Sequence, residues 1–343
     1  MYGGDVLGQA TLKVLGCTLQ PKSRYRPAWL AIFASLGLLG GCGANPVEDD
    51  VSLDFSVLFG FTPEAPDPEL FEARDGTMLP YRHYRSESSL KLVLLHGSGS
   101  HGRYLASLAN AISKAEAADV FTPDLRGHGV HPVRRGDIDY IEQLEDDVAD
   151  LIAHIRSDSP RATILLGGHS SGGGLALRFA GSPYSDQVSG YLLLAPFLRH
   201  DAPTTRQNSG GWARPKIARI VFLSILNGLG IRSFNSTVVI EFEMPEAARD
   251  GTETLAYSFR LNTGFAPRDY QADLSALNAR GLPLLVLVGA EDEAFVADAY
   301  TDVLNEHAPT AKLEILPDQS HLGLVVGEPV RVPAIDWLRE QAL

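Results

Sequence analysis

The sequence has little cysteine, a deficit of positive charge and no apolar run long enough to cross a membrane. Its 343 residues include only two cysteines, which excludes a framework of several disulfides and leaves the fold to be held by its hydrophobic core. Acidic residues outnumber basic ones by 42 to 29, and a net charge of −13 makes nucleic acid an unsuitable partner. Hydrophobic residues at 45% and charged residues at 21% are typical of a globular protein and argue against disorder.

The most apolar stretch near the amino terminus, residues 29–39, predicts a secretory signal. Spanning a bilayer takes roughly 20 residues, and this run is too short for that. It follows Lys22, Arg24 and Arg26 and ends in small residues, which is the order of a signal peptide. The tetrapeptide Leu39-Gly40-Gly41-Cys42 resembles the bacterial lipobox, in which the cysteine is lipidated and becomes the first residue of the mature protein.

Processing at Cys42 would define the mature protein. Cleavage removes the other cysteine, Cys17, together with four basic residues and one acidic residue, so that 25 basic and 41 acidic residues remain and the net charge is −16. We therefore expect an exported protein attached to a bacterial membrane through lipid on Cys42, since a basic surface is lacking. Gly43, in place of an aspartate, favours the outer membrane. The alternative is an ordinary signal peptide in which the cysteine is incidental.

Beyond this segment the chain divides into a tether and one large domain. Residues 43–68 mix prolines with acidic residues and predict a tether, and residues 69–343 predict an α/β domain. In that domain, Asp75-Gly76 predicts a hairpin turn, and four short, continuously apolar runs follow that suit parallel strands covered on both faces. The runs are residues 92–95, 164–166, 191–194 and 284–288. Helical spacing between and after them predicts a doubly wound, mostly parallel sheet.

The alternation of strands and helices is interrupted between residues 197 and 269, a stretch too long for a connecting loop and therefore expected to form a cap. Five apolar residues there share one helical face: Ile217, Ile220, Val221, Ile225 and Leu229. Two roles are open for this face: it admits an acyl chain, or it packs over the core.

Ser170 is the candidate nucleophile. The apolar run at residues 164–166 leads into Gly168-His169-Ser170-Ser171-Gly172, and a helical pattern follows. This is the G-x-S-x-G pattern of a nucleophile elbow, in which the serine lies on a strained turn between strand and helix and its neighbours must be small. The alternative for the pentapeptide alone is a glycine-rich turn.

A serine hydroxyl needs a base, and the base needs a group to orient it. His321 lies in a predicted loop between the strand 312–316 and the last helix, so it is the candidate base. The segment Glu291-Asp292-Glu293 follows the preceding strand, and Asp292 is the preferred third member, with both neighbouring glutamates as alternatives. The order Ser, Asp, His is that of the fold in which this elbow occurs.

Backbone N–H groups must stabilise the oxyanion that forms during attack. Ser171 follows the nucleophile at a helix start, where the helix dipole also favours negative charge. Ser98 lies in the glycine-rich loop after the strand 92–95, and Gly97 or Gly99 are alternatives to it. The loop from Asp124 to Gly129 is interpreted as a hydrogen-bonded support under the site.

These motifs together resemble the α/β-hydrolase superfamily, and most closely the branch of monoacylglycerol lipases, lysophospholipases and serine aminopeptidases of family S33. The resemblance spans roughly residues 70–342 and rests on His96-Gly97, the loop from Asp124, the elbow at Ser170, Asp292 and His321. It implies an eight-stranded sheet with a helical cap, an acyl-enzyme mechanism, and neither cofactor nor metal. Histidine and serine beside Ser170, where proline iminopeptidases tend to carry serine and tryptophan, disfavour peptidase activity.

The sequence therefore predicts a serine hydrolase that cleaves carboxylic esters, lipid-like ones of the monoacylglycerol or lysophospholipid type. Two alternatives remain at this point. One is an acyltransferase that uses the same three residues, and the other is a non-catalytic, exported binding module. The oligomeric state is not indicated by the sequence.

Overall fold

The computed structural model describes residues 53–206 and 211–342. The predicted signal segment, the lipidation site Cys42 and the first part of the predicted tether, residues 43–52, lie outside the described residues. Within the described ranges no helix is both long and apolar enough to cross a bilayer.

An eight-stranded sheet forms the centre of the domain, with the strand order β1-β2-β4-β3-β5-β6-β10-β11. The strands are β1 (Glu69–Glu72), β2 (Met78–Tyr84), β3 (Leu90–Leu95), β4 (Asp119–Pro123), β5 (Thr163–His169), β6 (Tyr191–Leu194), β10 (Leu284–Gly289) and β11 (Lys312–Leu316). β2 pairs antiparallel with β1 and with β4, and each pairing from β4 across to β11 is parallel. The predicted mostly parallel, eight-stranded sheet is thereby confirmed.

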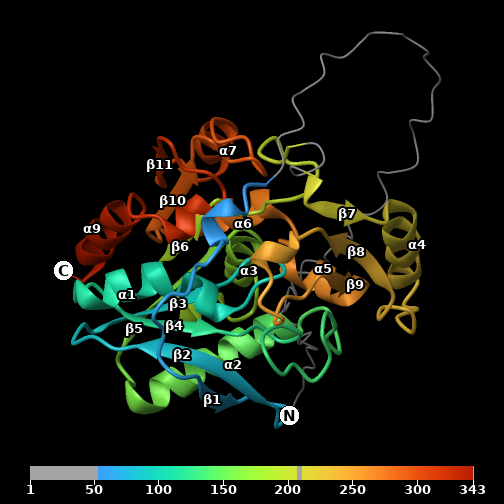
Figure 1. The fold of residues 1–343 in the computed structure, drawn as a ribbon, viewed down its shortest axis with the longest axis horizontal. Helices are drawn as coiled ribbons and strands as arrows, with labels where there is room; N and C mark the ends of the chain where they lie inside the picture. Colours follow the sequence, from blue (N-terminus) through green and yellow to red (C-terminus); the bar gives the residue numbers. More distant parts are fainter. Residues whose placement is uncertain (1–52, 207–210, 343) are drawn as a thin grey trace, which may run out of the picture. The chain divides into compact units, whose positions relative to one another are not determined.

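The central strands are continuously apolar because helices cover the sheet. The helices around the sheet are α1 (Ala106–Lys114), α2 (Gln143–Asp158), α3 (Ser171–Ala180), α6 (Tyr270–Ala279), α7 (Ala299–His307), α8 (Gly323–Val326) and α9 (Arg331–Gln341). One group packs α8 and α9 on α1, and the other packs α2 and α6 on α3, with α7 on α6 (Figure 1). All residues of β6 and β10 are buried, as expected for strands covered on both faces.

A separate group of elements lies between β6 and α6, in the stretch expected to form the cap. It consists of β7 (Ala213–Pro215), α4 (Ile217–Gly228), β8 (Val238–Phe242), β9 (Ala256–Ser258) and α5 (Phe259–Phe265). The three strands form a second, antiparallel sheet in the order β7-β8-β9. Figure 1 shows α4 beside β8, away from the strands of the large sheet.

The apolar face predicted for α4 does not pack over the core, which was one of its two expected roles. Four of its five residues are exposed: Ile217 by 57%, Val221 by 52%, Ile225 by 48% and Leu229 by 71%. The helix instead buries Leu223, which clusters with Val239 and Phe259. The expected packing was wrong because α4 is apolar on nearly every side, so periodicity alone could not identify the face that packs.

The described part of the predicted tether begins with a short packed segment. Leu53 and Phe55 are only 7% and 6% exposed and join the main core cluster, and a 3-10 turn follows at Ser56–Leu58. Their large apolar side chains gain free energy by leaving water, which the surrounding proline and acidic residues do not. This segment, residues 53–58, differs from a solvated linker and lies at the pocket that contains Ser170.

Candidate active site

Ser170 lies at the sharp turn between β5 and α3. Its backbone has φ +54° and ψ −121°, a conformation that non-glycine residues rarely adopt. The two flanking glycines make the turn possible. A Cβ on Gly168 would lie 2.4 Å from backbone atoms of Gly172, and a Cβ on Gly172 would lie 2.4 Å from the carbonyl oxygens of Leu95 and His96. The local geometry therefore has the strain and crowding that a nucleophile elbow requires.

Asp292 and His321 come from the loops that follow β10 and β11, and they form a close pair. His321 Nδ1 lies 2.8 Å from Asp292 Oδ2, and the two residues are 4% and 1% exposed. The other carboxylate oxygen of Asp292 accepts hydrogen bonds from the backbone N–H groups of Ala294 at 2.9 Å and Phe295 at 2.7 Å. These bonds fix the carboxylate, which in turn fixes the orientation of the imidazole.

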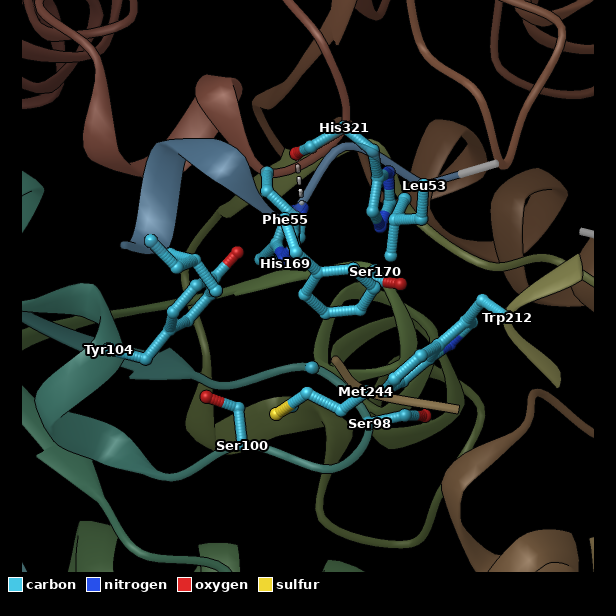
Figure 2. Close-up of a pocket in the computed structure, with 13 residues that line it drawn as sticks. Leu53, Phe55, Ser98, Ser100, Tyr104, His169, Ser170, Trp212, Met244 and His321 are labelled. Atoms are coloured by element: carbon cyan, nitrogen blue, oxygen red, sulfur yellow. Dashed lines mark hydrogen bonds between the residues drawn. The ribbon is translucent and has the colours of Figure 1, made fainter. Parts of the chain in front are cut away.

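Ser170 and His321 line one cavity of about 40 Å³. Figure 2 shows both side chains turned into it, with Phe55, Trp212 and Met244 around them. Its wall combines three sources: loops at the carboxyl ends of the sheet, residues 53–58, and the stretch between β6 and α6. The structure therefore brings the three predicted triad residues into one place.

The three neighbouring carboxylates left open by the sequence have different environments. Glu291 is exposed, whereas Asp292 and Glu293 are buried. Glu293 accepts the backbone N–H of His321 at 2.8 Å through Oε2 and that of Asp54 at 3.1 Å through Oε1. Of the three carboxylates, only Asp292 contacts the imidazole ring, so its geometry supports the preference for it.

His169 also makes a hydrogen bond to the backbone of His321, a contact that the sequence did not predict. Its Nε2 lies 3.1 Å from the carbonyl oxygen of His321, and the two rings are 4.5 Å apart at their centroids (Figure 2). Burial lowers the pKa of His169 well below its usual value, so the ring is neutral and Nε2–H donates. The residue occupies the variable position of the elbow, and its position at the end of β5 was the available signal.

The two loops expected to form the oxyanion hole meet beside Ser170. Ser98 Oγ and Ser171 Oγ are 2.7 Å apart. The Gly99 N–H already donates to Tyr257 Oη at 2.7 Å, which leaves Ser98 or Gly97 as the donor from this loop. Burial lowers the pKa of His96 to about 3, and its neutral ring accepts the backbone N–H of Leu125 at 3.1 Å while Nδ1–H donates to the Gly97 carbonyl at 2.9 Å.

The loop that begins at Asp124 lies under the site and makes buried hydrogen bonds. Asp124 Oδ1 accepts from Arg82 and from the backbone N–H of Gly102, both at 2.8 Å. His128, at the other end of the loop, contacts Tyr257 Oη at 2.7 Å. These contacts fit the interpretation of the loop as a support. Across the described residues, no cluster of three or more His, Cys, Asp or Glu side chains could hold a metal ion.

Comparison with known proteins agrees with this architecture. The family model described as serine aminopeptidase, S33, matches residues 86–325. The chain belongs to this family. The resemblance inferred from the motifs is thereby confirmed for the branch that contains the serine aminopeptidases of family S33.

Two individual relatives of this S33 family member match it over only part of their length. The protein phosphatase methylesterase 1 of Bos taurus is 32% identical over 115 residues, 33% of this chain and 30% of that protein. The monoglyceride lipase of Rattus norvegicus is 30% identical over 137 residues, which are 38% of this chain and 43% of that protein. The matched stretch thus spans less than half of either relative.

Solved structures extend the likeness of the fold over the whole domain. A soluble variant of monoglyceride lipase from Saccharomyces cerevisiae has a TM-score of 0.61 at 17% identity, over 83% of this chain and 97% of that chain. A thermophilic esterase from Thermogutta terrifontis has a TM-score of 0.56 at 21% identity, over 81% of this chain and all of that chain. At these identities the structures show the α/β-hydrolase fold.

Proposed function

We propose that this protein hydrolyses carboxylic esters through an acyl-enzyme on Ser170. The observation on which the proposal rests is the 2.8 Å contact between His321 Nδ1 and Asp292 Oδ2, with Ser170 on the same small cavity. Because Nδ1–H donates to the carboxylate, the lone pair of the imidazole is on Nε2, where a base for Ser170 is needed.

Each step of the reaction has a residue to perform it. Ser170 Oγ attacks the ester carbonyl carbon while His321 Nε2 takes the hydroxyl proton. The carbonyl oxygen becomes an oxyanion, which accepts hydrogen bonds from the backbone N–H groups of Ser98 and Ser171. When the C–O bond breaks, His321 returns the proton to the leaving alcohol. Water then attacks the acyl-enzyme with His321 as base again and releases the acid and the free serine.

The substrate class that we propose is a lipid-like ester of the monoacylglycerol or lysophospholipid type. The name monoglyceride lipase among the relatives supports this class. The predicted export, lipidation at Cys42 and attachment to an outer membrane would hold the enzyme beside such substrates, and these remain predictions from the sequence. No cofactor has a role in the reaction as written, and we propose neither nucleic acid nor a metal as a partner.

Replacement of Ser170 tests the proposal. We expect Ser170→Ala to lower the turnover of nitrophenyl esters by about 10⁶-fold and to abolish labelling by a fluorophosphonate, because the triad acts as a unit. Ser171→Ala is the matched control: its backbone N–H remains, so substantial turnover is expected. Undiminished turnover in the Ser170 variant would contradict the mechanism.

The two alternatives give different outcomes in the same assay. An acyltransferase would convert a nitrophenyl ester and an added alcohol into a new ester at the expense of free acid. A binding module would leave the ester intact and the serine unlabelled in the unmodified protein.

A further inference from the structure

Residues 53–58 lie over the candidate nucleophile although they are not part of the sheet. Leu53 and Phe55 line the cavity that contains Ser170 and His321 (Figure 2), and Leu58 also lines it. The Phe55 ring packs on Trp212, which precedes β7, with 5.4 Å between ring centroids. This segment and the stretch between β6 and α6 thus close the same side of the cavity.

The segment is hydrogen-bonded to the loop that contains Asp292, the predicted acid of the triad. The Asp54 N–H donates to Glu293 at 3.1 Å, and the other oxygen of Glu293 accepts the backbone N–H of His321 at 2.8 Å. The Asp54 side chain in turn accepts the Ser56 N–H at 2.9 Å, which shapes the turn that follows. One buried carboxylate therefore holds both the segment and the backbone of His321.

The space that remains over Ser170 is small. The cavity holds about 40 Å³, whereas an apolar cavity that takes a single benzene molecule is about 150 Å³. An acetyl group fits this space as it stands, whereas the longer chain of the lipid-like esters proposed above fits only when a side chain of the wall moves. An extended chain that stays within this partly open cavity would have to occupy positions now filled by apolar side chains of its wall.

We propose that Leu53 and Phe55 determine the acyl length that the site accepts. The inference rests on the proposed ester hydrolysis and adds a residue-level basis for its selectivity. Short acyl groups bind with residues 53–58 in place. A longer chain displaces the Phe55 side chain from Trp212 and loses that packing energy, so long-chain, lipid-like esters react with a penalty that short esters do not have.

The experiment uses the full chain and compares Phe55→Ala with Phe59→Ala. Phe59 follows the same 3-10 turn, is 51% exposed and is not among the residues that line the cavity, so it is a matched control. The measurement is kcat/KM for nitrophenyl acetate, butyrate, octanoate and dodecanoate. We expect Phe55→Ala to raise the ratio of octanoate to acetate by about 10-fold or more, since one methylene in an apolar pocket already changes selectivity by about 10-fold.

Other outcomes identify where the reasoning fails. Phe59→Ala should leave the ratio within twofold. A ratio that stays the same or falls in Phe55→Ala overturns the inference, because Phe55 would then be neutral or would help to bind the chain. Phe55→Trp gives the opposite test in a variant that keeps a bulky aromatic ring: the ratio of butyrate to acetate should fall.

A pair of fluorophosphonates with short and long alkyl chains separates this inference from the proposed function. Their labelling rates need only a reactive Ser170 and no ester turnover. A protein that hydrolyses no ester but labels more quickly with the long reagent after Phe55→Ala refutes the proposed activity and supports the size limit. An unmodified protein that labels with neither reagent refutes both.

Discussion

The three adjacent carboxylates Glu291, Asp292 and Glu293 can be tested by substitutions that keep the shape of each side chain nearly constant. Only its charge and its hydrogen-bond acceptors change. Each is replaced by its amide in turn. Because Glu291 is exposed, Asp292 contacts the imidazole and Glu293 binds two backbone N–H groups, the three variants should give three different results.

The expected magnitudes follow from the hydrogen bonds. In Asp292→Asn the single oxygen can serve either His321 Nδ1–H or the backbone N–H groups of Ala294 and Phe295. If it serves the backbone, the amide N–H₂ faces Nδ1 and selects the tautomer with its proton on Nε2, which cannot accept from Ser170. A loss of about 10⁴-fold in kcat is expected from such a tautomer change.

In Glu293→Gln one of the two N–H groups, from Asp54 or His321, loses its acceptor. A buried hydrogen bond to a charged group contributes about 1.5–3 kcal/mol, so the free energy of unfolding should fall by about 2 kcal/mol. The loss in kcat should be smaller than for Asp292→Asn because the imidazole keeps its carboxylate. Glu291→Gln should change the free energy of unfolding by less than about 0.5 kcal/mol.

The assay combines urea unfolding, followed by tryptophan fluorescence, with turnover of nitrophenyl acetate by each variant. Normal stability with very low turnover is expected for Asp292→Asn alone. If Glu291→Gln or Glu293→Gln lost as much turnover as Asp292→Asn is expected to lose, while Asp292→Asn stayed active, the proposed assignment of the triad acid would be refuted.

Two further predictions concern the scaffold of the site. Gly172→Ala places a methyl group 2.4 Å from two backbone oxygens and should lower the free energy of unfolding by about 3 kcal/mol, whereas Gly228→Ala, with open space around it, should change it by less than about 1 kcal/mol in urea unfolding. The pKa of His96 is about 3 when folded and about 6.5 when unfolded, so stability should decline as the pH falls from about 6.5 towards 3. His96→Gln should flatten that decline in a pH series, and an unchanged slope would contradict it.

Most of the large sheet could be predicted from the sequence because local patterns determine it. The apolar runs at 92–95, 164–166, 191–194 and 284–288 coincide with β3, β5, β6 and β10. Strands that are buried on both faces must be continuously apolar, and runs this short suit strands better than helices. The candidate triad could be located for a related reason, since parallel strands bring the loops at their carboxyl ends to one edge.

The walls of the pocket could not be predicted in the same way. Residues 53–58 lie within the stretch 43–68, whose prolines and acidic residues indicated a tether; Leu53 and Phe55 alternate there with polar residues, but this pattern alone does not tell which surface they pack on. The contact between Phe55 and Trp212 joins positions more than 150 residues apart, and it depends on where the stretch between β6 and α6 folds back. The face of α4 that packs depended in the same way on a partner strand, β8.

Both walls are connected to the residues proposed to perform the chemistry. Residues 53–58 reach the His321 backbone through Glu293, and the second sheet reaches the glycine-rich loop through Tyr257, which accepts the Gly99 N–H and contacts His128. If a long acyl chain displaces Phe55 and the neighbouring Asp54 moves with it, Glu293 moves too and the N–H contact that positions His321 is disturbed. We expect the penalty for long esters to appear in kcat as well as in KM, because preorganisation of the base is part of the catalytic effect. A penalty confined to KM in the unmodified protein would show that the segment limits size without affecting the position of the base.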